Sequence, residues 1–278
     1  MKKIDSTSNS AALPNQNSSQ QSSHTIILLA SGLSRRLGET KQLLYKNGVP
    51  LISHMIRLAA STNPQVIIVV IPKNEASIAS EVAKLSDTHL HIKTVINQTP
   101  ETGMGHSLYT AIEALTQFVN DKDFNHEVVE RVLIIGVDQV LLNLEHINGL
   151  LAGKHLVVAS GYEHWQIFDM LSKDDYIERR ADAKNETKNP IVGLPLVIDY
   201  QLLKQWQLHI SGDKGLRHLI RALSPSEIRT VFNKQLSYDI DTPEQLAYAR
   251  QQGWVDKYFD AKNRLDDRHI TPKPLVGL

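Results

Sequence analysis

HTIILLASGLSRRLGETKQLL, residues 24–44, is the stretch that decides the fold. It opens with a strand-forming apolar run at 26–29 and passes into a turn of small residues, Ala30, Ser31 and Gly32. Small residues let backbone N–H groups come close to an anionic ligand. Basic side chains that can balance phosphate charge follow at Arg35, Arg36 and Lys41. The stretch therefore predicts a strand that ends in a nucleoside-triphosphate-binding loop.

Two better-known phosphate loops do not fit this stretch. A P-loop needs G-x-x-x-x-G-K-[ST], but five residues separate Gly32 from Gly38, and Glu39 rather than lysine comes next. The dinucleotide fingerprint G-x-G-x-x-G does not occur after the strand either. From these residues alone, an ordinary strand–turn–helix junction with solvated arginines is the alternative.

The stretch resembles L-A-A-G-x-S-x-R-M-G-x-x-K-x-L-L, the signature of the MobA-like nucleotidyltransferases, and within them the molybdenum cofactor cytidylyltransferases. Nine positions agree with it: Leu29, Ala30, Gly32, Ser34, Arg36, Gly38, Lys41, Leu43 and Leu44. Ser31 and Leu37 depart from it.

Further segments resemble this family in the family's own order. The segment at 97–108 agrees with N…G-M-x-x-S-L through Asn97, Gly103, Met104, Ser107 and Leu108. The segment at 132–142 resembles a strand that ends in D-Q-P, with Val140 in place of the proline, and DIDTPEQL at 239–246 resembles D-I-D-T-P-E-D-L. Weaker similarities are Gly193 to Pro195 with G-x-P, and Gly212 to Arg217 with G-D-x-G-x-R.

Apolar β-branched runs alternate with helical patterns along the chain. Strands are expected at 25–29, 66–71, 93–96, 132–137, 156–159, 196–198 and 228–231, and helices at 51–60, 75–85, 107–118, 144–151, 200–207, 214–223 and 243–252. The alternation predicts an α/β fold with a doubly wound, mostly parallel sheet and helices on both faces. The resemblance implies the same Rossmann-like nucleotidyltransferase fold. Ligands of such sheets bind at the carboxyl ends of the strands, where Gly32 and Asp138 both fall.

The composition along the chain predicts one domain between two flanking segments. Residues 1–23 are rich in Ser, Asn and Gln and predict a disordered leader, 24–259 form the expected nucleotidyltransferase domain, and 260–278 form a loose tail. The stretch at 162–190 is longer than the family segment that it replaces. Its charge mix favours a solvated insertion, although Trp165 and Phe168 could cover a planar ligand.

Net charge and cysteine content exclude several function classes. The formal net charge is zero, with 30 basic and 30 acidic residues, so no overall field favours nucleic acid or an anionic membrane. The chain has no cysteine, which excludes disulfides and thiolate metal sites and fits a reducing, cytoplasmic compartment. No apolar run approaches the roughly 20 residues of a membrane span.

Asp138 is the first candidate metal ligand, because it follows the buried strand at 132–137. A triphosphate needs a hard divalent cation, Mg²⁺ or Mn²⁺, and such ions take one or two carboxylates together with phosphate oxygens. The resemblance implies Asp241 as the second ligand, and Asp239 can take the same place. The alternatives are a strand-end turn former for Asp138 and a helix N-cap for Asp241.

The resemblance also implies roles for the remaining candidates. Arg36 and Lys41 would hold the triphosphate and, with Asp138, form the catalytic set. The nucleotide-binding candidates are Leu29, Ala30, Ser31, Gly32, Ser34, Asn97, Gly103 and Ser107. By resemblance the donor is CTP and the acceptor is molybdopterin, and a molybdoenzyme or its maturation chaperone would receive the product. Three alternatives stay open: the same chemistry with GTP or a sugar-phosphate acceptor, a non-catalytic nucleotide-binding accessory protein, and a structural or interaction domain.

Overall fold

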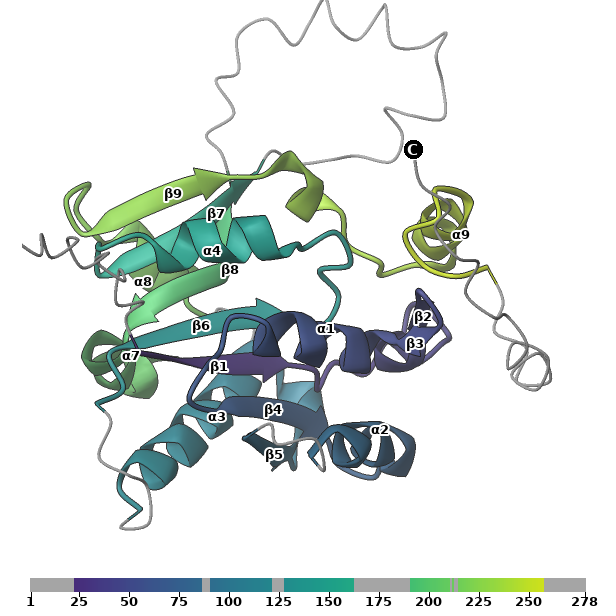
Figure 1. Cartoon of the computed structure of the whole chain (residues 1–278), viewed down its shortest axis with the longest axis horizontal. Coiled ribbons are helices and arrows are strands. Elements are labelled where there is room, and N and C mark those ends of the chain that lie inside the picture. Colours follow the sequence, from purple (N-terminus) through teal and green to yellow (C-terminus); the bar gives the residue numbers. More distant parts are fainter. Residues whose placement is uncertain are drawn as a thin grey trace, which may run out of the picture.

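A mixed seven-stranded sheet organises the molecule (Figure 1). The computed structural model describes residues 23–86, 91–121, 128–162, 191–210, 212 and 215–257. The strand order is β5-β4-β1-β6-β8-β7-β9. The strands are β1 (His24–Leu29), β4 (Ile67–Pro72), β5 (Ile92–Asn97), β6 (Arg131–Gly136), β7 (Val157–Tyr162), β8 (Ile191–Asp199) and β9 (Ile228–Phe232). Almost all of the expected leader and tail, and all but the first residue of the insertion at 162–190, lie outside the described residues.

Parallel pairing builds the first half of the sheet. β1 pairs in parallel with both β4 and β6, and β4 pairs in parallel with β5. In the second half, β8 runs antiparallel to β6 and to β7, whereas β7 and β9 are parallel. The prediction of a mostly parallel, doubly wound sheet is therefore confirmed. The direction of β8 could not be predicted, because an apolar strand gives no signal of its orientation.

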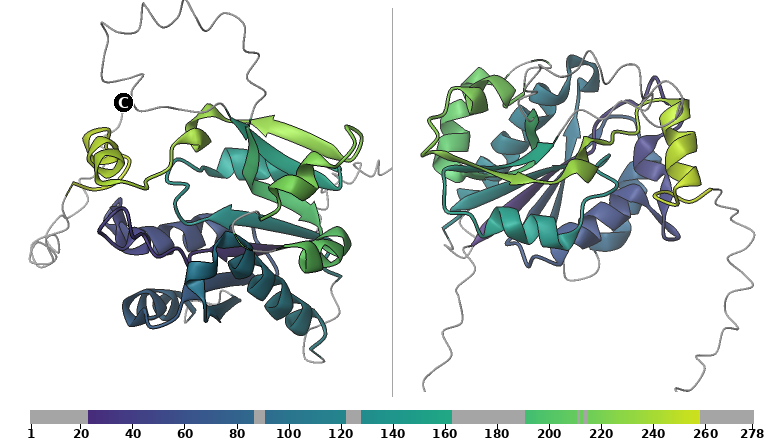
Figure 2. Two further views of the ribbon diagram at one scale, coloured as in Figure 1. Left: turned by 180° about the vertical axis from the view of Figure 1, so that it is seen from behind. Right: turned by 90° about the horizontal axis from the view of Figure 1, so that it is seen from above.

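Helices cover both faces of the sheet (Figure 2). One face packs against α1 (Leu51–Ala60), α2 (Ala76–Ser86) and α4 (Leu144–Leu151), and α9 (Pro243–Gln251) joins the same apolar core from beyond the sheet. The other packs against α3 (Met104–Val119), α7 (Tyr200–Trp206) and α8 (Arg217–Arg221). The run in β1 is apolar throughout because Ile26 and Leu28 enter the first core while Ile27 and Leu29 enter the second.

Each expected strand and helix has a counterpart; the helices expected at 51–60 and 144–151 have the expected bounds, and the ends of the others are shifted. The helix expected at 107–118 begins earlier, at Met104, because Gly103 with its positive φ of 100° breaks the chain just before it. The helix expected at 214–223 is restricted to Arg217–Arg221. A short hairpin of β2 (Tyr45–Lys46) and β3 (Val49–Pro50) was not foreseen.

The turn of the hairpin β2–β3 is hydrogen-bonded to the segment that follows α9. The backbone amides of Asn47 and Gly48 donate to the carboxylate of Asp256, at 3.1 and 2.8 Å. Figure 1 shows α9 beside β2 and β3, away from the sheet. The residues before α9 therefore cross from the end of the sheet back toward the loop that follows β1.

Candidate functional site

A cavity of about 980 Å³ lies beyond the carboxyl ends of β1 and β6. These two strands are neighbours, with Leu29 opposite Gly136, so the segments that follow them enter the cavity side by side. Its lining includes most of the expected site residues: Leu29, Ser31, Gly32, Ser34, Arg36, Lys41, Gly103, Ser107, Asp138, Asp239 and Asp241. Ala30 and Asn97 do not line the cavity; both are fully buried behind it.

Lys41 bridges two carboxylates that are far apart in the sequence. Its ammonium lies 3.2 Å from Asp138 Oδ2 and 2.8 Å from Asp241 Oδ1. The lysine side chain is only 11% exposed. Burial favours the neutral amine, but the charges and hydrogen bonds of the two carboxylates outweigh burial and raise the pKa of Lys41. Lys41 is therefore a fixed positive charge.

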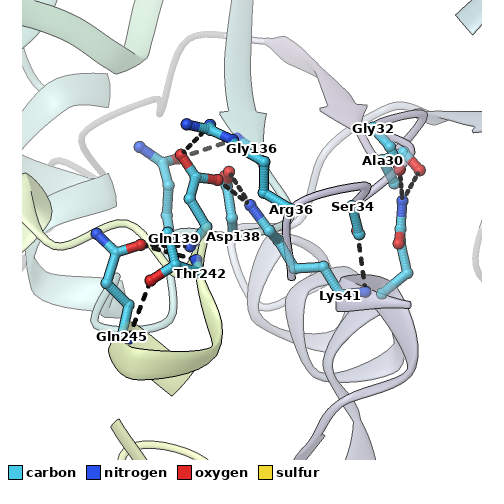
Figure 3. A network of polar contacts seen from close by, with 12 residues as sticks. Ala30, Gly32, Ser34, Arg36, Lys41, Gly136, Asp138, Gln139, Thr242 and Gln245 are labelled. Carbon is cyan, nitrogen blue, oxygen red and sulfur yellow. Dashed lines mark hydrogen bonds and ion pairs between the residues drawn. The ribbon is translucent and has the colours of Figure 1, made fainter. Parts of the chain in front are cut away.

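Arg36 adds a second cation from the solvent side. Its guanidinium donates to Asp241 Oδ2 at 3.0 Å, and its side chain is 74% exposed. Burial opposes ionisation of Asp241, but hydrogen bonds and charge from Lys41, then Arg36, hold the pKa of Asp241 below its usual value. Figure 3 shows Arg36, Lys41 and Asp138 converging on one point.

Asp239 is the third carboxylate of this group. Burial, followed by the negative charges of Asp138 and Asp241, raises its pKa to about 7, although Lys41 opposes the shift. The upward shift means that Lys41 does not fully balance the negative charges of Asp138 and Asp241 at the position of Asp239. Such a site has room for a further cation.

The start of α9 positions Asp241. Thr242 is the N-cap and accepts from the amide of Gln245, so the cap alternative for Asp241 is wrong. Gln245 Oε1 accepts from the amides of both Asp241 and Thr242, at 2.8 and 2.9 Å. This capping box fixes the backbone and leaves the Asp241 carboxylate free to face Lys41.

Gln139 and Gly136 position Asp138. Gln139 belongs to the segment that resembles D-Q-P, but this positioning role was not predicted for either residue. Gln139 Oε1 accepts from the amide of Gly136 at 2.9 Å and so closes the turn that carries Asp138. A Cβ added at Gly136 would lie 2.7 Å from Asp138 Oδ1. Glycine at the end of β6 is therefore what lets the carboxylate fold back over the strand.

Three buried polar side chains, Ser31, Asn97 and Ser107, meet beside the turn that follows β1. Ser31 Oγ and Ser107 Oγ are 2.5 Å apart, and Asn97 Nδ2 donates to Ser107 at 3.0 Å. Asn97 is held in turn, because its Oδ1 accepts from the amide of Thr99 at 3.0 Å. The structure thus brings together residues 31, 97 and 107, although Asn97 acts from behind the lining.

Further residues line the cavity that the sequence did not single out. Tyr162, Val192 and Leu216 lie toward α8, together with the exposed cations Arg217 and Arg221. Burial and the charges of Asp239 and Asp138 raise the pKa of Tyr162, and Arg217 opposes the shift. Arg217 belongs to the segment that resembles G-D-x-G-x-R, and this weak motif could have identified it as a site residue. Tyr162 belongs to no motif, so the sequence could not have identified it.

The carboxylates do not form a complete metal cage. Among the described residues, no three His, Cys, Asp or Glu side chains gather in a geometry that would hold a metal by themselves. Two carboxylates that share one cation are instead the donor set that Mg²⁺ uses when phosphate oxygens and water complete its shell.

No helix in the described part of the chain has the length and hydropathy to cross a bilayer.

Comparison with known proteins supplies the family. The model of the MobA-like NTP transferase domain matches residues 26–228, which is more than half of the chain. The chain belongs to the MobA-like NTP transferase family. The resemblance drawn from the motifs is confirmed at this level. No curated protein sequence matches the chain significantly.

Solved structures share the fold at low sequence identity. A nucleotidyl transferase from Methanothermobacter thermautotroptrophicus superposes with a TM-score of 0.58 and 15% identity, over 83% of this chain and 97% of its own. For 4-diphosphocytidyl-2C-methyl-D-erythritol synthase from Anaerococcus prevotii the values are 0.55, 16%, 84% and 96%. For Rv0371c of Mycobacterium tuberculosis, in a complex with manganese, they are 0.51, 16%, 81% and 97%.

Proposed function

We propose that this MobA-like transferase moves a cytidylyl group from CTP to the phosphate of molybdopterin and releases pyrophosphate. One observation carries the proposal: Lys41, Arg36, Asp138 and Asp241 converge beside the small-residue turn that follows β1. Basic groups for a triphosphate and carboxylates for its metal thus stand at the carboxyl edge of the sheet, where α/β folds bind nucleotides.

The reaction exchanges one phosphoanhydride bond for another. An oxygen of the acceptor phosphate attacks the α-phosphorus of CTP, and the bond from the α-phosphorus to the bridging oxygen breaks. The electron pair of that bond leaves with pyrophosphate. Lys41 and Arg36 neutralise the charge that develops on the leaving group, and the protein aligns the two phosphates.

Mg²⁺ or Mn²⁺ fits between Asp138 and Asp241. Both carboxylates already bind one cation, Lys41, and Asp239 adds negative charge next to them. The manganese complex of a protein with the same fold is consistent with this assignment. When bound, the metal would polarise the α-phosphate. Asp138 and Asp241 would hold it, with Asp239 as the alternative to Asp241.

Ser31 bears on the choice of base. Its side chain occupies the position where a glycine would leave more room, and its hydroxyl is held by Ser107. A side chain at this position narrows the space for a bulky purine, so CTP is expected to be preferred to GTP. A shape contrast of this kind is worth roughly 10–200-fold in kcat/KM. The shared fold with a protein named for a diphosphocytidyl product supports the same base.

The acceptor is assigned to the part of the cavity near α8. Arg217 and Arg221 stand four residues apart and line the cavity, so they can face one anionic group. Tyr162, Val192 and Leu216 add aromatic and apolar surface there. This combination suits a flat heterocycle that carries a phosphate. In the cytoplasm, a molybdoenzyme or its maturation chaperone would take up the product.

A pyrophosphate-release assay tests the proposal. The full chain is incubated with Mg²⁺, with each of the four nucleoside triphosphates in turn, and with or without molybdopterin. Release that needs CTP, molybdopterin and metal together is expected. Release with GTP, or with a sugar phosphate, would keep the transferase reading and overturn the substrate. Tight nucleotide binding without any release would favour a non-catalytic accessory protein.

A further inference from the structure

Gln42 makes two buried hydrogen bonds to the turn that follows β1. Its Nε2 donates to the carbonyl oxygens of Ala30 and Gly32, at 2.7 and 2.8 Å. The residue is only 1% exposed. One carboxamide nitrogen therefore uses both of its hydrogens to hold two alternate carbonyls of the same turn.

Because the peptide group is planar, these two hydrogen bonds also determine the direction of the amide N–H groups in the turn. In a trans peptide the C=O of one residue and the N–H of the next point in opposite directions. Because the carbonyls of Ala30 and Gly32 point to Gln42, the N–H groups of Ser31 and Leu33 point away from it. Gln42 is almost fully enclosed and borders the cavity together with Ser31 and Gly32, whereas Leu33 does not line it.

These two amides are available for a ligand. Within the described part of the chain, the N–H groups of Ser31 and Leu33 have no backbone or side-chain acceptor. Two donors held in a fixed direction at the mouth of a strand form a site for oxygen or nitrogen acceptors. The cations Lys41 and Arg36 lie further along the loop, at the carboxylates.

We propose that Gln42 is a positioning residue that, by holding the Ala30 carbonyl, presents the amide of Ser31 to the nucleoside part of the triphosphate. This inference rests on the proposed function, because it assumes that a nucleotide binds in this cavity. Gln42 acts through the carbonyls of the turn, because both hydrogens of its Nε2 are donated to them. Lys41 and Arg36 hold the phosphates without its help.

Gln42 also carries a feature that suits a local role rather than a contribution to global stability. Its Oε1 is buried without a hydrogen-bond partner. Gln42→Met removes this unsatisfied acceptor together with the two donated bonds, so gain and loss partly offset each other. The variant is therefore expected to fold, with a turn that is free to change its direction.

Calorimetry with two probes tests the inference. Binding of CTP and of inorganic tripolyphosphate is measured, each with Mg²⁺, on the full chain. Gln42→Met is expected to weaken CTP about tenfold or more, as the loss of one or two oriented hydrogen bonds would. Tripolyphosphate, which has no nucleoside, is expected to bind as in the wild type. A purely structural defect would weaken both probes alike.

Gln42→Asn and Gln65→Met complete the design. Asparagine keeps the carboxamide but is too short to reach both carbonyls, so a smaller loss for CTP is expected, and this variant serves if methionine prevents folding. Gln65 is a half-buried glutamine just before β4, at the amino ends of the strands and thus at the far end of the sheet from the cavity, and Gln65→Met should change neither probe.

Each outcome decides between two hypotheses. Unchanged CTP binding in Gln42→Met, or an equal loss for both probes, would overturn the role of Gln42. A wild-type chain that binds neither CTP nor any other nucleoside triphosphate would instead overturn the proposed function.

Discussion

The two segments that form the site are held in different ways. The turn at 30–32 is fixed by short, buried, neutral hydrogen bonds from Gln42, and Ser31 is bonded to Ser107. The acidic segment at 239–241 is held by ions. Lys41 and Arg36 bind Asp241, and Arg250 forms a two-bond ion pair with Glu39, which ties α9 to the loop.

The difference predicts different behaviour toward ligands and salt. Buried neutral hydrogen bonds are not screened by salt, so we expect the turn to be ordered before a ligand binds. Ion pairs with half-exposed partners weaken with ionic strength, and their cations can be exchanged for others. We therefore expect the turn to supply selectivity and the acidic segment to supply an adjustable charge.

The largest expected effect is that of removing Asp138, one of the two carboxylates that pair with Lys41. Asp138→Ala should lower kcat by about 10²–10³ or more, because a group that holds charge in the transition state is lost. Pyrophosphate release in saturating Mg²⁺ gives the rate, and circular dichroism confirms that the fold is retained. Substantial turnover by the variant in the presence of a chelator would remove Asp138 from the metal site.

Replacement of Lys41 separates its two roles. Lys41→Met should weaken nucleoside-triphosphate binding, since a nearly buried cation is lost. The same change should strengthen binding of Mn²⁺ alone, because the carboxylates of Asp138 and Asp241 no longer have an internal counter-ion. Titration of free Mn²⁺ by electron paramagnetic resonance measures the second effect, about tenfold in dissociation constant.

Lys46→Met is the matched control for the metal titration. Lys46 is a half-buried lysine near the same site. Its ammonium donates to the carbonyl of Val140 rather than to a carboxylate. Its loss should leave Mn²⁺ affinity unchanged. Equal Mn²⁺ affinity in wild type and Lys41→Met would show that Lys41 does not compete with the metal.

The contrast between the two segments also explains what the sequence could predict. The turn and the strand before it are contiguous, so small residues and an apolar run identified them together. Asp241 lies 200 residues from Lys41, and only a family motif joined them. The neutral contacts of Gln42 and Gln139 were missed, because a glutamine that bonds to backbone carbonyls or amides leaves no pattern in the sequence.

Element types were easier to predict than their ends or their pairing. Runs such as β1 and β6 are buried on both faces, and this alone indicates a strand in a helix-covered sheet. The direction of β8 and the hairpin β2–β3 depend on tertiary packing, which short apolar runs do not encode. The choice of Thr242 over Asp241 as the cap likewise depended on the capping box that Gln245 completes.

Thr242→Ala tests whether the helix cap positions Asp241. Loss of an N-cap lowers the free energy of unfolding by about 0.5–2 kcal/mol. Because the cap also orders the backbone of Asp241, affinity for Mg²⁺ with CTP should fall by a few fold in addition. Thermal unfolding and calorimetry measure the two effects.

Asn143→Ala provides the comparison for Thr242→Ala. Asn143 caps α4, where its side chain accepts from the amide of His146 at 2.9 Å, and it does not line the cavity. Its loss should destabilise the fold to a similar degree and leave nucleotide affinity unchanged. A similar loss of affinity in both variants would mean that the cap acts on the site only through overall stability.

The smallest expected effect is the contribution of one buried histidine, His146, to the pH dependence of the free energy of unfolding. His146 is 6% exposed, and its Nε2 lies 2.8 Å from Ser160 Oγ, which donates to the carbonyl of Pro195. Ser160 Oγ therefore accepts from His146 Nε2–H, and burial, which disfavours the charged imidazolium, lowers the pKa of His146. The folded state then binds this proton less readily than the unfolded state, whose histidine pKa is about 6.5.

The sign of the pH effect follows from this difference. The contribution of neutral His146 to stability is fully present above pH of about 6.5 and is lost as the pH falls toward the lower pKa of the folded state. Urea unfolding at a series of pH values between about 7.5 and 5 measures it. His146→Gln, which can still donate to Ser160, should flatten the curve in this interval. An unchanged slope would assign the acid sensitivity to other groups, first to His54, whose pKa burial also lowers, with help from the charges of Lys46 and Arg57.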